Sequence, residues 1–108
     1  MLWLFEKLWE ALKRLGRWLR TKILNFVRNI KAFFLEKKQQ ELLKKKKEVI
    51  ACSIKDKLGN GDYGVVNCLY DTETEDVVSM DYATGVEAEQ LDAETAGYFG
   101  SKDMIVLT

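Results

Sequence analysis

The stretch of this 108-residue chain whose residue types most suggest chemistry is the segment LGNGDYGVV at residues 58–66. Gly59, Gly61, Gly64 and Val66 fill the fixed places of the pattern G-x-G-x-x-G-x-V. Glycines at this spacing allow a loop to approach the phosphates of a nucleotide closely. The same residues also suit a glycine-rich turn between two strands.

The charges around the glycines favour the turn. A phosphate site needs positive potential or a helix N-terminus. Asp62 lies inside the segment, and no Lys or Arg occurs between Lys57 and Lys102. We therefore expect the glycines to allow positive φ or a β-bulge, and we expect no bound nucleotide and no other cofactor.

Residues 58–80 also resemble the start of the small lobe of protein kinases, on the glycine pattern and the hairpin that follows it. The resemblance implies that the phosphate-holding lysine of that family would fall on Met80, whose thioether cannot bind phosphate. Neither an H-R-D loop nor a D-F-G motif follows. Kinase activity is therefore not expected.

Other catalytic chemistry is poorly represented. The chain has no His, which removes Ser-His and Cys-His catalysis and most zinc sites. Its two cysteines, Cys52 and Cys68, form no C-x-x-C pair and are expected to be buried thiols, with a disulfide as the alternative. We expect no enzyme, no catalytic residue and no metal site.

Charge divides the chain into two halves. Residues 1–48 carry 14 Lys and Arg against 5 Asp and Glu, a net +9, whereas residues 49–108 carry 3 against 12, a net −9. Such an asymmetry predicts an electrostatic partner for each half, or each half as the partner of the other. No run of uncharged residues approaches the roughly 20 that a membrane-spanning helix needs, and no secretory signal is expected.

Residues 1–35 have the periodicity of one long amphipathic helix. Apolar residues recur 11 apart, about 3.67 residues per turn, which keeps the apolar stripe nearly straight. Gly16 interrupts the pattern at a cost of about 1 kcal/mol relative to Ala. We expect the stripe and its tryptophans to contact a membrane or a partner, with packing on the chain's own second half as the alternative. The residues concerned are Trp3, Phe5, Leu8, Trp9, Leu12, Leu15, Trp18, Leu19, Ile23, Phe26, Ile30 and Phe34.

Basic side chains dominate the other face of this helix and the segment 36–48, which is predicted to be a basic helical extension or linker. Near an anionic leaflet each contributes about 1 kcal/mol. Nucleic acid is not expected as the partner, because the aromatic residues lie in the apolar stripe and do not alternate with the lysines. The predicted electrostatic contacts come from Lys13, Arg14, Arg17, Arg20, Arg28, Lys31, Lys44, Lys45, Lys46 and Lys47.

Residues 49–108 predict a small acidic β-rich domain of about four strands. Strands are expected after residue 48, on both sides of the acidic turn at 72–75, and within 103–108. A helix is expected over 86–96, with Thr84 and Glu87 as a capping box and Gly97 at its end. The predicted fold class is α+β, a long N-terminal amphipathic helix followed by a small antiparallel β-rich domain with one short helix.

These features predict a non-enzymatic, cytoplasmic, membrane-associated adaptor or regulatory protein. The basic amphipathic helix would bind an anionic membrane surface and present the acidic domain. The alternative is a structural or interaction subunit whose N-terminal helix packs into a partner-protein groove or larger assembly, or self-associates as a homo-oligomer.

Overall fold

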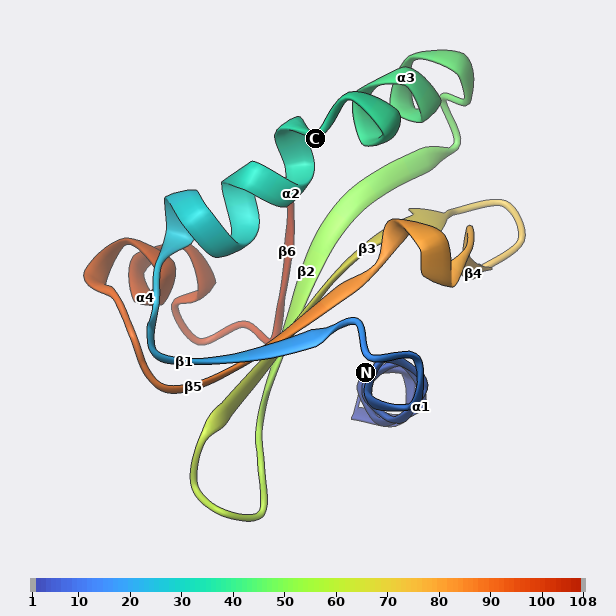
Figure 1. The fold of residues 1–108 in the computed structure, drawn as a ribbon. Helices are drawn as coiled ribbons and strands as arrows, with labels where there is room; N and C mark the ends of the chain where they lie inside the picture. The colour runs from blue at the N-terminus through green and yellow to red at the C-terminus, as the bar shows by residue number, and fades with distance from the viewer. Residues whose placement is uncertain (1, 108) are drawn as a thin grey trace.

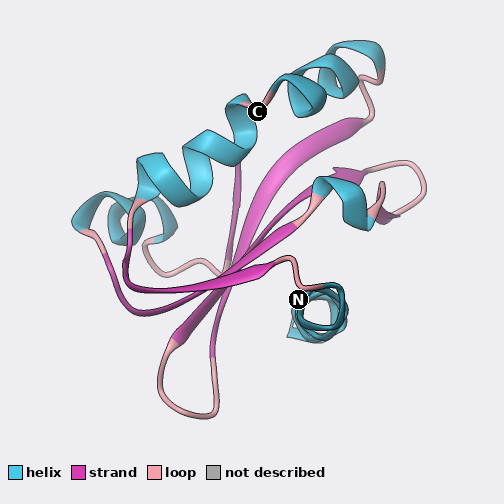
Figure 2. Ribbon diagram, viewed as in Figure 1, coloured by secondary structure: helices cyan, strands magenta, loops and turns pink. Residues whose placement is uncertain are grey.

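The computed structural model describes residues 2–107, which form a six-stranded sheet with helices on both faces (Figure 1). One face is covered by α1 (Leu2–Leu15). The other face is covered by the π-helix η1 (Phe26–Lys31), α2 (Ala32–Leu35), α3 (Lys37–Lys45) and α4 (Ala93–Phe99). The mixed composition of helices and strands, visible in Figure 2, confirms the predicted α+β fold class.

The strands follow the order β1-β5-β3-β2-β6, and β4 pairs with the end of β3. Only β1 and β5 run parallel; the other pairs are antiparallel. A 3-10 helix, η2 (Met80–Tyr82), precedes β5. The strands are β1 (Trp18–Leu24), β2 (Val49–Lys57), β3 (Tyr63–Asp71), β4 (Asp76–Val77), β5 (Thr84–Leu91) and β6 (Met104–Val106). The glycine-rich turn between β2 and β3, the hairpin around the acidic turn and the final strand are confirmed.

The N-terminal helix ends at Leu15, although the periodicity predicted a helix to residue 35. Gly16 has a φ of 69°, in the left-handed region that glycine adopts at little steric cost. Its N–H donates to the Lys13 carbonyl at 3.3 Å, and the Arg17 N–H donates to the Leu12 carbonyl at 3.0 Å. These two bonds form the Schellman motif of a helix C-terminus. Gly16 therefore ends the helix and is not a weak point inside it.

The chain then enters the sheet as β1, so the first 48 residues contribute a strand to a sheet that was predicted only for residues 49–108. The β-branched Thr21 and Ile23 suit an extended backbone. Pairing with β5 sets Leu19 beside Val86. A continuous helix over residues 1–35 would be about 50 Å long, whereas the longest dimension of the molecule is 37 Å.

Helical structure resumes after Asn25, which caps η1. The Asn25 side-chain oxygen accepts from the Arg28 N–H at 2.9 Å, and the Asn25 N–H donates to the Asn29 side chain at 2.8 Å. The π-helical turns that follow are wider than α-helical turns because each bond spans five residues. At Glu36 the backbone leaves the helical region, with φ −58° and ψ 141°, and this separates α2 from α3.

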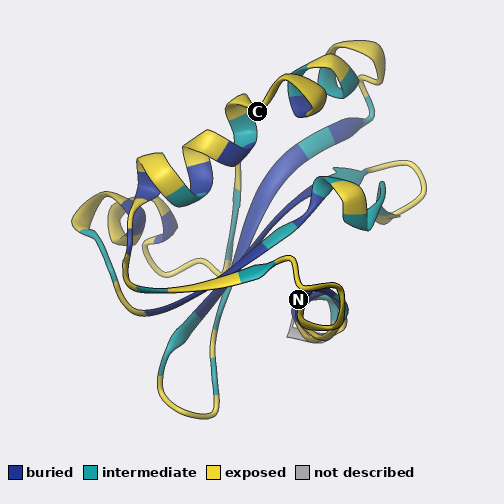
Figure 3. Ribbon diagram, in the orientation of Figure 1, coloured by how far each residue is buried: buried dark blue, intermediate teal, exposed yellow. Residues whose placement is uncertain are grey.

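The apolar face of α1 packs against the sheet. Phe5, Leu8, Trp9 and Leu12 are at most 6% exposed. The central strands β2 and β3, against which they lie, are mostly buried as well (Figure 3). Burial of a side chain of this kind stabilises a fold by roughly 1.5–3 kcal/mol, so α1 is an integral layer of the structure. Its packing partners on the sheet and beside it include Cys52, Ile54, Val66, Cys68 and Ala83.

The opposite face of the sheet carries a buried polar ladder among apolar side chains. Ser53 on β2 donates to the side-chain oxygen of Asn67 on β3 at 2.5 Å. The Asn67 amide donates to the Asn29 carbonyl of η1 at 2.7 Å and to the Thr84 hydroxyl at 3.3 Å. Because an unpaired polar group in this interior would be costly, these bonds fix the position of η1 over the sheet.

The helix predicted over residues 86–96 is wrong, because residues 84–91 form β5. The Thr84 hydroxyl accepts a hydrogen bond from the side chain of buried Asn67, and Glu87 lies on β5. The expected capping box therefore does not form. The helix starts later, with Asp92 as its N-cap. It ends at Gly100, whose φ of 56° fits a helix C-terminus, and not at Gly97.

Gly64 lies under α1, and its lack of a side chain sets how closely the helix approaches the sheet. A Cβ atom there would come within 2.8 Å of a Phe5 ring carbon and 3.3 Å of Trp9. We expect Gly64→Ala to lower the free energy of unfolding by about 1–3 kcal/mol in urea denaturation, because α1 must shift. Gly59→Ala is the matched control, since a Cβ there meets nothing within 4 Å. Equal stability of the two variants would contradict this account.

The charge of Asp92 contributes to stability. Partial burial acts to raise its pKa, but hydrogen bonds from Thr95 and from the Phe26 N–H outweigh burial and lower the pKa below the usual 3.8. A lowered folded-state pKa gives stability that is present at neutral pH and lost as the pH falls through that pKa.

We therefore expect Asp92→Asn to lower the free energy of unfolding at pH 7 by about 1–2 kcal/mol, since the Asn oxygen can still cap the helix but the charge and the second oxygen, which accepts from the Phe26 N–H, are lost. The difference from the parent chain should shrink as the pH falls to about 2.5. Asp103→Asn, at an exposed position, is the control. A difference that does not change with pH would contradict the assignment.

Candidate functional site

The predicted contact residues separate into two groups. Half of them form the protein's own core, at no more than 6% exposure: Phe5, Leu8, Trp9, Leu12, Phe26 and Ile30. Trp18 and Phe34 are half-buried, and the side chain of Trp3 lies outside the described part of the structure. The stripe as a whole is therefore not a surface in this fold.

Leu15, Leu19 and Ile23 remain exposed, at 58%, 50% and 48%. Two further exposed apolar side chains, Val27 at 52% and Leu35 at 55%, were not among the predicted contacts. All five come from residues 15–35, which contain β1 and the helices that follow it. The candidate site is therefore centred on β1 and no longer on α1.

The backbone of β1 is paired on one side only. β1 is the first strand in the sheet order, and among residues 2–107 no strand other than β5 pairs with it. The Arg17 carbonyl accepts from the Gly85 N–H on the β5 side. Because alternate residues of a strand direct their backbone groups to opposite sides, the N–H and C=O groups of Trp18 and Arg20 and the N–H of Lys22 point away from β5. The alternation shifts after Thr21: the register skips Lys22, and the Leu24 carbonyl accepts from the Asp92 N–H on the β5 side at 2.9 Å.

The side chains of residues 18–21 alternate between the two faces of the sheet, and Leu24 lies under the helical layer, on the same face as Leu19. Leu19 lies beside Val86, a core residue under the helical layer. Arg20 lies on the α1 side, where its guanidinium pairs with the Asp62 carboxylate at 3.1 Å. The edge of the sheet thus presents apolar side chains on one face and basic side chains on the other.

Positive charge is concentrated around β1. Residues 11–35 contain seven Lys and Arg and no Asp or Glu. Arg17 pairs with Asp81 at 3.7 Å, and Lys13 lies 5.3 Å from the centre of the Trp18 ring. Within residues 2–107, five of the seven form no ion pair: Lys13, Arg14, Lys22, Arg28 and Lys31.

The lysine tract is a separate surface. Lys44 to Lys47 are exposed at the end of α3, which packs against β2. β2 is separated from β1 by β5 and β3. The structure therefore does not join the tract to the basic surface around β1, although both were predicted to act together.

The glycine-rich segment forms the turn between β2 and β3. Gly61 has a φ of 91°, and the Leu58 N–H donates to the Asp62 carbonyl across the turn at 2.7 Å. The Asn60 amide donates to the Glu87 carboxylate at 3.2 Å. The carboxylates of Asp62 and Glu87 thus lie next to the loop, where a phosphate would be repelled. Met80 lies in η2 and not on a strand.

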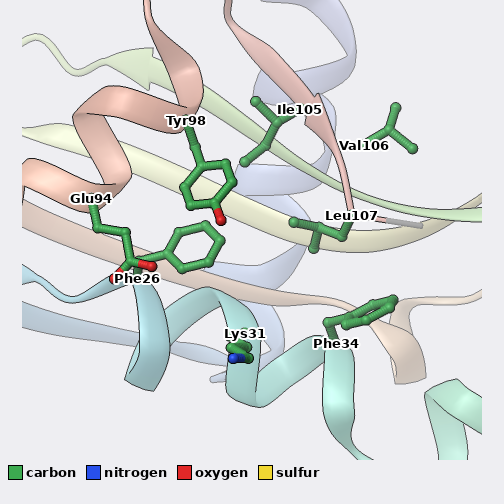
Figure 4. Close-up of a pocket in the computed structure, with 8 residues that line it drawn as sticks. All are labelled: Phe26, Lys31, Phe34, Glu94, Tyr98, Ile105, Val106 and Leu107. Atoms are coloured by element: carbon green, nitrogen blue, oxygen red, sulfur yellow. The ribbon is translucent and has the colours of Figure 1, made fainter.

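A pocket lined by aromatic and aliphatic side chains lies between η1, α2, α4 and β6 (Figure 4). Phe26 and Tyr98 stack in it with ring centres 4.3 Å apart, and Phe34 lines its far side. Its volume of about 240 Å³ lies below the roughly 300–1,000 Å³ of typical ligand pockets. It therefore supports no ligand assignment.

The two cysteines are buried and free, as predicted. Cys52 and Cys68 lie opposite each other on β2 and β3, with sulfur atoms 3.6 Å apart, beyond disulfide length. The hydrogen bond with Cys52 and burial raise the pKa of the Cys68 thiol. A protonated, covered thiol is a poor nucleophile.

Among the described residues, no group of three or more Cys, Asp and Glu side chains is arranged to hold a metal ion. Nor does any helix within residues 2–107 combine the length and apolarity needed to cross a bilayer. The chain matches no protein-family model, no curated protein and no solved structure.

Proposed function

We propose that this protein is a non-enzymatic interaction module that binds an extended segment of a partner protein along the outer edge of β1. The observation that supports this proposal is the unpaired backbone edge of a seven-residue strand with half-exposed Leu19 and Ile23. An open strand edge is a template for another strand, and several peptide-binding domains use it in this way.

The two ends of the sheet differ. β6, at the far end, has only three residues. Short edge strands are one of the ways in which proteins protect a sheet from unwanted pairing. β1 is longer and carries apolar side chains at its exposed edge, so it is the better docking strand.

The energetics indicate a moderate affinity. Trp18, Arg20 and Lys22 offer three N–H groups, and Trp18 and Arg20 two C=O groups; each net hydrogen bond contributes roughly 0.5–1.5 kcal/mol. Association costs roughly 4–15 kcal/mol in lost freedom. Backbone pairing alone therefore gives little net affinity, and contacts with the side chains of β1 must supply the remainder.

The proposal predicts that the outward N–H of Lys22 is needed for binding. Extended peptides would be selected from a random display library against the whole chain, and their affinity measured for Lys22→Ala and Lys22→Pro. Both variants lose the charge, but only proline also loses the N–H. Proline is tolerated in an edge strand at a position whose N–H is unpaired.

We expect Lys22→Pro to bind about tenfold more weakly than Lys22→Ala, the loss of roughly one hydrogen bond and its strand contacts. Both variants should unfold at similar urea concentrations. Selected peptides that bind the two variants equally would rule out β1 pairing as the mode of binding.

A second candidate function, attachment to an anionic membrane surface, is favoured by the charge of residues 11–35, which have seven basic and no acidic residues. Exposed Leu15, Leu19, Ile23 and Val27 lie among them. This attachment would use the surface around β1, because the apolar face of α1 is packed against the sheet.

The membrane candidate predicts binding to vesicles rich in phosphatidylserine at low salt. The combined variant Arg14→Gln, Lys22→Gln and Arg28→Gln should bind roughly a hundredfold more weakly, at about 1 kcal/mol per charge. Lys44→Gln, Lys45→Gln and Lys46→Gln together form the control, with the same loss of charge elsewhere. Vesicle flotation that shows no binding, or an equal loss in both variants, would contradict attachment through this surface.

A further inference from the structure

We infer that the segment accepted by β1 is an acidic strand in which Asp or Glu alternates with apolar residues. This inference rests on the proposed strand pairing and adds the chemical character of the partner. Its acidic side chains would lie on the α1 side of the sheet and its apolar side chains on the side of η1.

The neighbour that β1 already has provides the first argument. Val86 of β5 lies beside Leu19, and Glu87 lies beside Arg20. Ala88 lies beside Thr21, and Glu89 follows it in the sequence; the register skips the position of Lys22. The part of β5 that pairs with Leu19 and Arg20 thus offers an apolar residue to the apolar one and an acidic residue to the basic one.

The same side chains of β1 are available to a strand on its other side. Side chains of adjacent strands that share a face lie about 4.5–5.5 Å apart, on whichever side the neighbour sits. Lys22 is exposed and has no ion pair within residues 2–107, and the Arg20 side chain is 54% exposed although it pairs with Asp62. A carboxylate opposite Arg20 and a second one near Lys22 would meet these two charges.

Pairing of β1 with a second copy of itself is disfavoured by charge. A two-fold antiparallel pair centred on Arg20 or on Lys22 sets like residues opposite each other. A pair centred on Thr21 sets Arg20 opposite Lys22 of the other copy. Like charges directly opposite each other destabilise a strand pair, so every central register of the homotypic pair is unfavourable.

The surroundings of β1 extend this preference. Arg14, Arg28 and Lys31 are exposed in the segments before and after the strand, and residues 11–35 contain no acidic side chain to attract a basic or neutral partner. An acidic segment is attracted along the whole length of the edge, which raises its rate of association at low salt.

Three synthetic nine-residue peptides would test the inference against the full chain by fluorescence anisotropy. Each has valine at alternate positions, with glutamate, threonine or lysine between them. We expect the glutamate peptide to bind about tenfold more tightly than the threonine peptide and the lysine peptide not to bind. The preference for glutamate should weaken in 0.5 M salt, as expected for partly exposed charges.

Lys22→Glu should weaken the glutamate peptide about tenfold and favour the lysine peptide, whereas Lys47→Glu, the same charge change on the separate lysine tract, should leave both unchanged. Equal binding of the threonine and glutamate peptides, with both sensitive to Lys22→Pro, would overturn the inference and leave strand pairing intact. Glutamate-peptide binding that is insensitive to Lys22→Pro would overturn both, as would binding of anionic vesicles without binding of any peptide.

Discussion

The left-handed turn at Gly16 sends the chain from α1 directly into the edge of the sheet. Two consequences depend on it. Because the helix stops at Leu15, most of its apolar face, from Phe5 to Leu12, packs against the sheet. Because the chain then extends, residues 18–24 become a strand beside β5. A helix that continued past Gly16 would leave the edge of β5 open and remove the surface on which the proposed binding depends.

The basic and acidic halves of the sequence lie against each other within the fold. β1 from the basic half lies beside β5 from the acidic half, and Arg17 and Arg20 pair with Asp81 and Asp62. Partly exposed pairs of this kind contribute only about 0–1 kcal/mol each, so the burial of the apolar side chains of α1 accounts for far more of the cohesion. The charges instead determine which strand pairs with β1, both β5 within the fold and the proposed partner at its open edge.

The sequence predicted the local features of the fold better than the long-range ones. The glycine turn between β2 and β3, the acidic turn and the last strand depend on turn residues and short apolar runs, and they are present. Residues 18–24 were misassigned because their apolar positions fit both a helical and a strand pattern, and pairing with residue 85 and beyond decided between them.

The boundary signals for that strand were nonetheless present in the sequence. Gly16 is a helix-ending residue and Asn25 a helix-capping one, and between them residues 18–23 alternate basic or aromatic with apolar or β-branched side chains. The same period of two, in Val86 to Glu89, argued against the helix predicted over 86–96. For the site, the basic and apolar composition of the segment was recognised, but its exposed positions were not, because burial of α1 is a tertiary effect.

The buried polar ladder gives the edge strand its rigidity. Asn67 binds the Asn29 carbonyl, and this bond holds η1 over the sheet near Leu19. Asn25, which directly follows β1, caps the same helix. β1 is therefore fixed by β5 along one side and by η1 at its end, while its outer side stays open. A strand held in this way loses little conformational entropy when a partner pairs with it. A few backbone hydrogen bonds and two half-exposed apolar side chains can therefore give a measurable affinity, because little of their binding energy is spent on ordering β1.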